Sequence, residues 1–220
     1  MKQNIFFKKG AEAELVEEIV EGDTPGSEKK LLSKKRIPKS YRNPLLDLLI
    51  RKARTRSEAK LLREVSSAVN VPEIKKVDEN KAEILMEFIE GKRLKEVIEK
   101  KPALAEEAGK MIKKIHALGI IHGDLTTSNM LFVDEKQFKS DKEMLKRIKQ
   151  KGNLFFIDFG LGYYSKKVED RATDLVVFKK TFNATHSSMK NGWKLVMKGY
   201  KPDEELLTRM EAIEKRARYH

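Results

Sequence analysis

Three polar residues stand in two short loops whose flanks are apolar. Asp124 and Asn129 lie five positions apart in IIHGDLTTSNMLF, residues 120–132, and Asp158 follows a buried-strand pattern in FFIDFGLG, residues 155–162. Phosphoryl transfer needs such a set. One carboxylate accepts a hydroxyl proton or orients the nucleophile, while a second carboxylate and an amide oxygen hold Mg²⁺ on the phosphates.

The order of these residues matches the protein kinase signature H-R-D-x-x-x-x-N followed by D-F-G. Here the first motif reads His122-Gly123-Asp124 and ends at Asn129, and the second reads Asp158-Phe159-Gly160. The alternative is that these are ordinary turn residues, since Asp, Asn and Gly are common in turns. Two motifs in the kinase order are more specific than one. We therefore favour phosphoryl transfer and interpret His122 as a residue that orients the loop backbone.

A kinase also needs a lysine that grips the phosphates and a carboxylate that holds this lysine. Lys34, Lys35 and Arg36 lie on a predicted strand over 29–37. Side chains alternate along a strand, so only one of the two lysines can point into a cleft. Glu58, on the first long helix after this strand, is the natural partner. The alternative for Glu58 is a capping box with Thr55, which has the correct spacing.

The elements around these residues change character along the chain. The first third predicts a small antiparallel sheet, and Asn43-Pro44 predicts the start of a helix. After Gly91 the pattern is mainly helical. The predicted strands are 4–7, 15–20, 29–37, 74–77 and 82–88, and the predicted helices after Gly91 are 93–100, 103–118, 170–182, 187–198 and 203–217. We expect an exposed hairpin or helix in the basic segment 134–152.

Composition narrows the class of protein. Lys and Arg number 47 and Asp and Glu 34 among 220 residues, so the net charge is +13. This excess favours a polyanionic partner such as nucleic acid, nucleotide phosphates or an acidic protein face. The absence of cysteine excludes a disulfide framework and cysteine catalysis. No apolar run approaches the ~18 residues of a membrane span, and the first residues lack a secretory signal. We expect a cytoplasmic protein without a membrane segment.

At this point the sequence resembles a specific family, the small atypical protein kinase subunit of the KEOPS complex, of the archaeal type. The run HGDLTTSN is particularly diagnostic, because ordinary protein kinases have Arg where Gly123 stands. The matching stretches are KKGAEAEL (8–15), KKRIPKSYRNPLLD (34–47), RTRSEAKLL (54–62), MEFIEG (86–91), IIHGDLTTSNM (120–130) and IDFGLGYYS (157–165).

The resemblance implies an α+β, bilobal protein-kinase-like fold of minimal size. A small β-rich N-terminal lobe with one main helix would span 1–88, a hinge 89–91, and a mostly helical C-terminal lobe 92–220. It also implies site residues. Asp124 would be catalytic, and Asn129 and Asp158 would bind Mg²⁺. The residues implied to bind ATP are Lys34 with its partner Glu58, Gly10 and Glu12 near the phosphates, Met86 behind the adenine, and Glu87 and Ile89 through their backbones.

Further family traits concern the segment after Asp158. Only a short stretch separates Gly160 from Asp174, and it lacks the A-P-E motif, so a long activation loop that docks peptides cannot fit. Asp174 resembles the buried helix aspartate that holds the catalytic loop. The chain ends in KRARYH, residues 215–220, which is less basic than the tail usual in the family. Segment 134–152 is longer than the family's usual connection, and we favour a solvated charged insert over a surface that faces a partner or RNA.

Three functions follow from these observations. The resemblance implies a Ser/Thr protein kinase or ATPase that uses ATP and Mg²⁺, contacts the KEOPS catalytic subunit and other subunits, and supports threonylcarbamoyl-adenosine modification of transfer RNA. A small-molecule kinase of the aminoglycoside or choline type is disfavoured by the short C-terminal half. A non-catalytic RNA-binding scaffold is disfavoured because Lys34, Asp124, Asn129 and Asp158 are all present.

Overall fold

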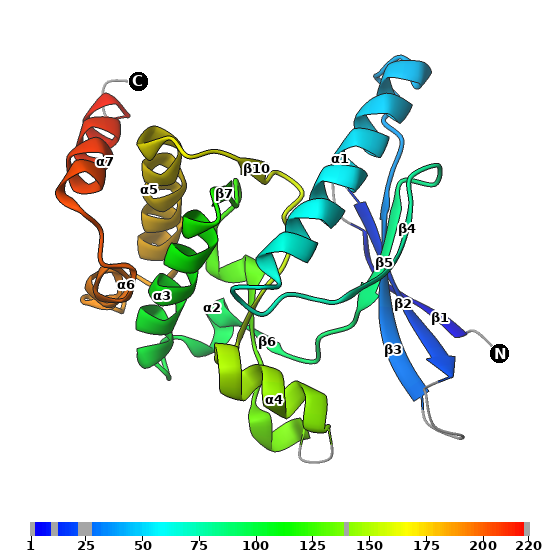
Figure 1. Cartoon of the computed structure of the whole chain (residues 1–220), viewed down its shortest axis with the longest axis horizontal. Helices are drawn as coiled ribbons and strands as arrows, with labels where there is room; N and C mark the ends of the chain where they lie inside the picture. Colours follow the sequence, from blue (N-terminus) through cyan, green and yellow to red (C-terminus); the bar gives the residue numbers. More distant parts are fainter. Residues whose placement is uncertain (1–2, 10–12, 22–27, 139–140, 218–220) are drawn as a thin grey trace. The chain divides into compact units, whose positions relative to one another are not determined.

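Five strands near the start of the chain pair into one antiparallel sheet. The computed structural model describes residues 3–9, 13–21, 28–138 and 141–217. The sheet order is β1-β2-β3-β5-β4, so consecutive strands pair as hairpins except where β5 inserts beside β3 (Figure 1). The strands are β1 (Gln3–Lys9), β2 (Ala13–Glu21), β3 (Glu28–Arg36), β4 (Ile74–Asp78) and β5 (Glu83–Glu87). The five predicted strands are confirmed, with ends shifted by a few residues.

One long helix, α1 (Pro44–Val65), follows β3. Asn43 caps its start, because the Asn43 side-chain oxygen accepts hydrogen bonds from the backbone N–H of Leu45 at 3.0 Å and of Leu46 at 3.4 Å. The capping box with Thr55, considered as the alternative for Glu58, is wrong. Both residues lie inside this continuous helix, where the backbone N–H groups already have helical partners.

Helix α1 is joined to the sheet by a small apolar cluster. Ala59 of α1 packs against Ile84 and Met86 of β5, and all three are buried. Partly buried side chains of β3 and β4 complete the cluster: Leu32, Ile74 and Val77. The small side chain of Ala59 lets the helix approach the strands closely, and the preceding residue, Glu58, contacts Lys34 and Arg36 of β3.

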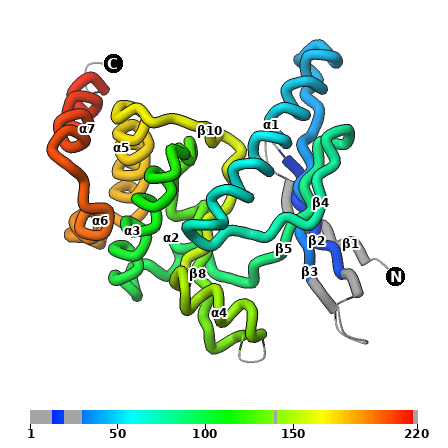
Figure 2. Tube along the Cα trace, in the orientation of Figure 1, coloured from blue at the N-terminus to red at the C-terminus, as the bar shows by residue number. Residues whose placement is uncertain are grey.

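The second half of the chain is mainly helical, as predicted. Its principal helices are α3 (Ala103–Ala117), α5 (Val168–Thr185), α6 (Gly192–Tyr200) and α7 (Glu204–Arg216). In Figure 2, α5, α6 and α7 follow one another toward the C-terminal end of the chain. The helix predicted over 93–100 is shorter than expected: α2 covers only Leu94–Val97 and continues as turns.

Two glycines allow α3 and α6 to pack in close contact. A Cβ atom on Gly109 would lie 2.0 Å from the carbonyl oxygen of Val196, and one on Gly199 would lie 1.9 Å from the carbonyl oxygen of Glu106. Both distances are far below any real contact of a Cβ atom. Because glycine has no side chain, each of these positions leaves room for the backbone of the other helix.

Short strands connect the helices around the two loops of interest. β8 (Met130–Phe132) pairs antiparallel with β9 (Leu154–Phe156) and with β6 (Lys92–Arg93). β7 (Ile120–Ile121) pairs with β10 (Tyr163–Tyr164). Sequence analysis predicted apolar pairs flanking polar loops here but not the pairing of the strands.

The basic segment 134–152 forms a short 3-10 helix, η2 (Glu135–Phe138), and the helix α4 (Lys142–Lys151). Asp141 caps α4 by accepting a hydrogen bond from the backbone N–H of Met144 at 2.9 Å. Met144 and Ile148, one turn apart, are buried. The segment is therefore an amphipathic helix with one face packed on its own chain, rather than a fully solvated insert.

The described residues fall into two compact units. The first comprises Met1–Arg63 and Pro72–Ile89, and the second comprises Glu64–Val71 and Glu90–His220. The segment 64–71 packs in the second unit through Asn70, which forms an isolated bridge with Phe155 of β9 and donates a hydrogen bond to the carbonyl of Gly152 at 2.8 Å. This β-rich unit with one main helix and this mainly helical unit are the α+β architecture that the sequence predicted.

Candidate phosphoryl-transfer site

Strand pairing in the second unit brings the two kinase-like motifs to the same end of one ladder. The register places Met130 of β8 opposite Phe156 of β9. One residue further on, the N–H of Ile157 donates to the carbonyl of Asn129 at 3.0 Å. Asn129 immediately precedes β8 and Asp158 follows β9 by two residues, so both leave the ladder at the same edge. Residues far apart in sequence thus become neighbours through backbone hydrogen bonds alone.

The loop from Asp124 to Asn129 is closed by the Asn129 side chain. Its Nδ2 group donates to the carbonyl oxygen of Asp124 at 2.9 Å and to the carboxylate Oδ2 of Asp124 at 2.8 Å. The two donors of the amide are therefore directed at Asp124. The amide oxygen is the part of Asn129 that remains to coordinate a cation, while the same contact fixes the Asp124 carboxylate.

Asp174 of α5 holds the start of this loop. Its carboxylate accepts hydrogen bonds from the backbone N–H of His122 at 3.0 Å and of Gly123 at 3.1 Å. His116 contacts the same carboxylate at 3.1 Å, and Tyr200 contacts His116 at 2.9 Å. Burial acts to raise the pKa of Asp174, but the hydrogen bond and charge of His116 outweigh it and hold this pKa below its ordinary value. Asp174 thus occupies the loop-holding position that the family resemblance implied.

Gly123 has a conformation that other residues rarely adopt. Its φ is +79°, and a Cβ atom at this position would lie 2.3 Å from the carbonyl oxygen of Leu161. The chain after the second motif therefore passes directly over Gly123. This contact explains why glycine stands where ordinary kinases have arginine: no side chain fits between the two loops.

His122 orients the backbone, as its sequence context indicated. Its Nδ1 accepts a hydrogen bond from the N–H of Asp124 at 3.3 Å, and its Nε2 contacts the carbonyl oxygen of Ile157 at 3.2 Å. This pair of partners requires the neutral ring with its proton on Nε2. Burial, the dominant cause, lowers the pKa of His122 and so favours that form. The ring also packs on buried Phe159, with centroids 4.5 Å apart, which links the first motif to the second.

Two further residues fix the loop, and sequence reasoning missed both. Buried His186, which follows α5, contacts the hydroxyl of Thr127 through Nε2 at 2.9 Å. Arg93 of β6 donates to the carbonyl oxygen of Ser128 at 2.7 Å. Neither residue belongs to a recognisable motif. Their roles depend on contacts between positions 35 and 59 residues apart, which no local pattern signals.

Asp158 is presented by a strained turn at the end of β9. Its φ is +64°, a left-handed conformation that a non-glycine residue seldom adopts. The side chain is exposed, and Oδ1 accepts a hydrogen bond from the N–H of Gly160 at 3.3 Å. Phe159, the next residue, is buried and anchors the turn. Such strain is characteristic of functional positions.

The side-chain oxygen atoms of Asn129 and Asp158 suit a magnesium ion. Carboxylate and amide oxygens are hard ligands, and Mg²⁺ is usually held by one or two protein groups together with phosphates and water. In the described part of the chain, no group of three or more His, Cys, Asp or Glu side chains could hold a metal by itself. Asn129 and Asp158 therefore suit a metal that completes its coordination with a phosphate substrate.

In the first unit, a buried carboxylate joins two cations. Glu58 of α1 binds the ammonium of Lys34 at 2.6 Å through Oε1 and the guanidinium of Arg36 at 2.7 Å through Oε2. Lys34 and Arg36 are two positions apart on β3 and share a face, whereas Lys35 between them is exposed. The role of Arg36 was not foreseen.

The remaining predicted ATP-binding residues have different environments. Met86 is buried in the cluster with Ala59, while Glu87 ends β5 and its N–H donates to the carbonyl of Glu73 at 2.8 Å. Ile89, the last residue of the first unit, is buried. Gly10 and Glu12 lie outside the described residues.

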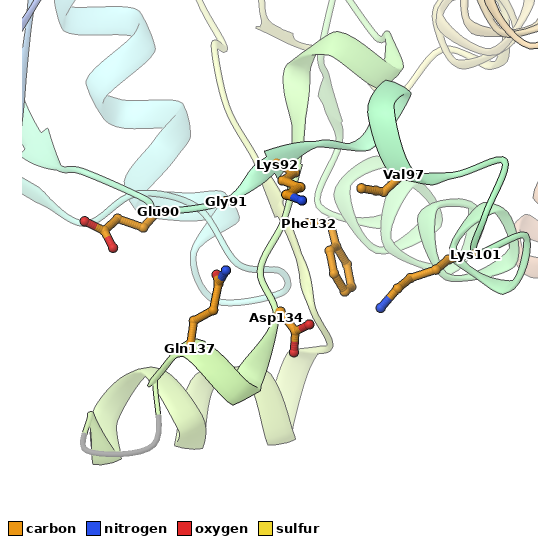
Figure 3. Close-up of a pocket in the computed structure, with 8 residues that line it drawn as sticks. All are labelled: Glu90, Gly91, Lys92, Val97, Lys101, Phe132, Asp134 and Gln137. Atoms are coloured by element: carbon orange, nitrogen blue, oxygen red, sulfur yellow. The ribbon is translucent and has the colours of Figure 1, made fainter.

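A separate pocket of about 530 Å³ lies in the second unit (Figure 3). Lys101 places its ammonium 4.3 Å from the centre of the Phe132 ring at one wall. The lining residues are Glu90, Gly91, Lys92, Val97, Lys101, Phe132, Asp134 and Gln137. Two lysines are matched by two carboxylates, so the pocket lacks the positive charge that a phosphate requires. We assign it no part in phosphoryl transfer.

The chain matches the model of the RIO domain over residues 29–141. It is similar to the KEOPS complex subunit Bud32 of Pyrococcus abyssi, with 38% identity over 86% of this chain and 84% of that protein. Probable bifunctional tRNA threonylcarbamoyladenosine biosynthesis proteins are also similar. That of Methanosarcina mazei is 40% identical over 87% of this chain, and that of Methanobrevibacter smithii is 40% identical over 97%. The chain spans only 32% and 36% of the length of these two relatives.

Solved structures support the fold. The Rio2 kinase from Chaetomium thermophilum, solved as an ADP/Mg²⁺–phosphoaspartate complex, superposes with a TM-score of 0.60 over 97% of this chain and 70% of that one, at 15% identity. WaaP in complex with acyl carrier protein gives a TM-score of 0.59 over 98% of this chain and 89% of that one, also at 15% identity. Within the described residues, no helix is long and apolar enough to cross a bilayer. Site geometry, the domain match and similarity over 84% of the Pyrococcus abyssi relative agree: the chain belongs to the RIO-domain family and, within it, to the family of the KEOPS complex subunit Bud32.

Proposed function

We propose that this protein transfers the terminal phosphoryl group of ATP, as a Ser/Thr protein kinase, an ATPase or both. The observation that carries the proposal is the second-unit loop. Asn129 fixes the Asp124 carboxylate at 2.8 Å, and the ladder from β8 to β9 brings Asp158 to the same edge. Phosphoryl transfer requires a carboxylate that can accept a proton and, beside it, two oxygen ligands for Mg²⁺.

Each side chain has a distinct role in this proposal. Asn129 and Asp158 hold Mg²⁺, which neutralises the charge of the phosphates when it is bound. Asp124 accepts the proton of the attacking hydroxyl or positions a water molecule. Its orientation is set by Asn129 and by the hydrogen bonds of Asp174 to the loop backbone, so little rearrangement is needed before reaction.

The first unit supplies nucleotide binding. Lys34 binds the phosphates and Glu58 holds it in place, with Arg36 as a second partner of Glu58. The backbone carbonyl of Glu87, whose N–H is already bonded to Glu73, and the backbone of Ile89 bind adenine, and Met86 lies behind it. We extend to Gly10 and Glu12 the family expectation that this segment covers the phosphates. Residues 1–88 then act as the nucleotide-binding lobe, 89–91 as the hinge and 92–220 as the catalytic lobe.

We propose that the biological setting is the KEOPS complex in the cytoplasm. The family relationship supports this, since relatives are named for that complex and for tRNA threonylcarbamoyladenosine biosynthesis. Partners are the KEOPS catalytic subunit and other subunits, with transfer RNA attracted by the net charge of +13. The segment after Asp158 is pinned by the pairing of β10 with β7, and α5 begins at Val168. Partner binding, rather than phosphorylation of a long activation loop, therefore controls the activity.

The test is turnover of labelled ATP by three variants at equal concentration. Asp158→Ala removes a metal ligand and abolishes magnesium-dependent turnover. Asp124→Ala keeps nucleotide binding and loses turnover by several orders of magnitude, as roughly expected for such groups. Glu135→Ala is the matched control, because Glu135 is an exposed carboxylate of the same unit. Wild-type turnover by the Asp124→Ala protein would refute the assignment.

A further inference from the structure

The pocket shown in Figure 3 is built by short elements that each contribute a pair of side chains. Lys92 of β6 stands directly opposite Phe132 of β8 in the strand register, so their side chains share one face of the ladder. Val97, at the end of α2, and Lys101 are four residues apart, and the N–H of Lys101 donates to the carbonyl of Val97 at 3.0 Å. Residues at this spacing on a helical turn lie on the same side.

The third pair comes from η2 and the residue before it. The N–H of Gln137 donates to the carbonyl of Asp134 at 3.0 Å, and side chains three residues apart in such a turn are aligned. The Asp134 carboxylate accepts a hydrogen bond from the N–H of Lys136 at 3.1 Å. The chain at Gly91 passes close to β8, since a Cβ atom there would lie 2.9 Å from the carbonyl oxygen of Phe132. Backbone contacts of the chain itself therefore fix the walls of the pocket.

The charged side chains of the pocket do not neutralise one another. The ammonium of Lys101 lies 4.3 Å from the centre of the Phe132 ring. In the part of the chain that the structure describes, neither this ammonium nor that of Lys92 forms a hydrogen bond or an ion pair, and the side-chain amide of Gln137 has no partner. The Asp134 carboxylate contacts a backbone N–H but no cation among those residues. Both signs of charge are thus presented to a ligand.

This balance of charge decides among the classes of ligand. Two lysines are accompanied by two carboxylates, so an RNA backbone or a polyphosphate gains no net attraction. An apolar small molecule would cover charged groups without giving them partners. A peptide segment satisfies the pocket. Its side chains can carry both charges, its backbone donates and accepts hydrogen bonds as the Gln137 amide does, and an apolar side chain can cover Phe132 and Val97.

The size and shape of the pocket agree with this class. Its volume of about 530 Å³ lies within the range of about 300–1,000 Å³ that is usual for ligand sites. In Figure 3, Glu90 and Lys101 stand at opposite ends of the pocket, with Phe132 between them. An extended segment can therefore pass across the ring.

We propose that this pocket binds a short extended segment of a partner protein, in which one apolar side chain stands between an acidic and a basic side chain. The apolar side chain packs on Phe132 and Val97. The acidic side chain pairs with Lys101 and the basic one with Asp134. The proposal goes beyond the proposed function and does not depend on it, because this binding needs neither ATP nor Asp124.

The experiment measures binding of defined peptides to the full chain by fluorescence anisotropy, without ATP. The probes are labelled, end-blocked pentapeptides with a central Phe, Leu or Val and with Lys at one end and Glu at the other, in both orders. Comparison sets have a central Gly, or two Lys, or two Glu, and oligouridylate serves as an RNA probe. We expect a dissociation constant below about 1 mM for a mixed-charge apolar peptide, and binding at least about tenfold weaker for the comparison sets.

Two variants locate the site. Lys101→Glu should weaken binding of the mixed-charge peptide at least about tenfold and improve binding of the peptide with two Lys, because it reverses one charge. Asp134→Asn keeps an acceptor for the N–H of Lys136 and should weaken binding by about threefold. The matched controls are Lys100→Glu and Glu135→Gln, at exposed neighbouring positions that do not line the pocket. They should change binding by less than about twofold.

Four results would overturn the proposal. The first is no binding by any mixed-charge apolar peptide, and the second is equal binding by the glycine-centred set. The third is a Lys101→Glu protein that binds every peptide like the wild type. The fourth is that the wild type binds oligouridylate, or associates with itself, and that only this binding is lost in Lys101→Glu, which would assign the pocket to RNA or to a second copy. ATP turnover is scored separately, so its absence in the wild type would refute the catalytic assignment alone.

Discussion

Replacing Gly123 with alanine tests the contact between the two catalytic motifs. The added Cβ would lie 2.3 Å from the carbonyl oxygen of Leu161 and 2.8 Å from its carbonyl carbon. A non-glycine residue at this positive φ costs about 1–2 kcal/mol, and relief of the clash costs about 1–3 kcal/mol more. We therefore expect a loss of about 2–5 kcal/mol in the free energy of unfolding. The backbone at Leu161 and the loop that carries Asp124 must move away from each other, so ATP turnover should fall as well.

Gly119→Ala is a matched control for backbone conformation. Gly119 also has a positive φ, +71°, but its Cβ would meet the nearest atom of Lys166 at 3.5 Å, an ordinary contact. It should lose only about 1–2 kcal/mol and retain turnover. The single tryptophan, Trp193, lies in α6 of the second unit, so its fluorescence can report denaturant unfolding of both variants. Equal stability and equal turnover of the two variants would refute the reasoning.

Three further predictions concern helix packing, pH and the lysine assignment. Gly199→Ala should force α6 away from α3 and lower the free energy of unfolding by about 1–3 kcal/mol, measured by denaturant titration; unchanged stability would contradict the crossing geometry. The hydrogen bonds of Glu106 with Lys110 and Lys198 lower its pKa from 4.5 to about 2, so its contribution to stability is present above pH 4.5 and is lost as the pH falls toward 2. Glu106→Gln should flatten this part of the stability profile, and an unaltered profile would argue against the ion pairs. Lys34→Ala should abolish most ATP turnover while the protein stays folded, because Arg36 still pairs with Glu58, whereas Lys35→Ala should act mildly; equal effects would contradict the assignment to Lys34.

Local pattern was sufficient for most of the elements. Strands alternating along the first third, the Asn43-Pro44 helix start and the helices after Gly91 follow from side-chain periodicity and capping, which operate over a few residues. Sequence analysis favoured Glu58 as the partner of a lysine on β3, which the contact with Lys34 bears out, whereas the alternative of a capping box with Thr55 is wrong. Capping-box spacing occurs by chance inside a helix, and only the burial of Glu58 between two cations selects its actual environment.

The sequence alone indicated phosphoryl-transfer chemistry, because two motifs with the required carboxylate and amide residues occur in the kinase order. It also determined that Lys34 and Lys35 lie on opposite faces, since alternation is a property of a single strand. The tertiary structure decided the rest. The register of β8 with β9 set Asn129 beside the Asp158 turn, and packing placed Asp174, His186 and Arg93 against the loop. It also left the large apolar side chains Leu45, Leu46 and Leu49 at the start of α1 exposed. These features depend on contacts between distant residues, whose formation reflects the free energy of the whole fold rather than any local preference.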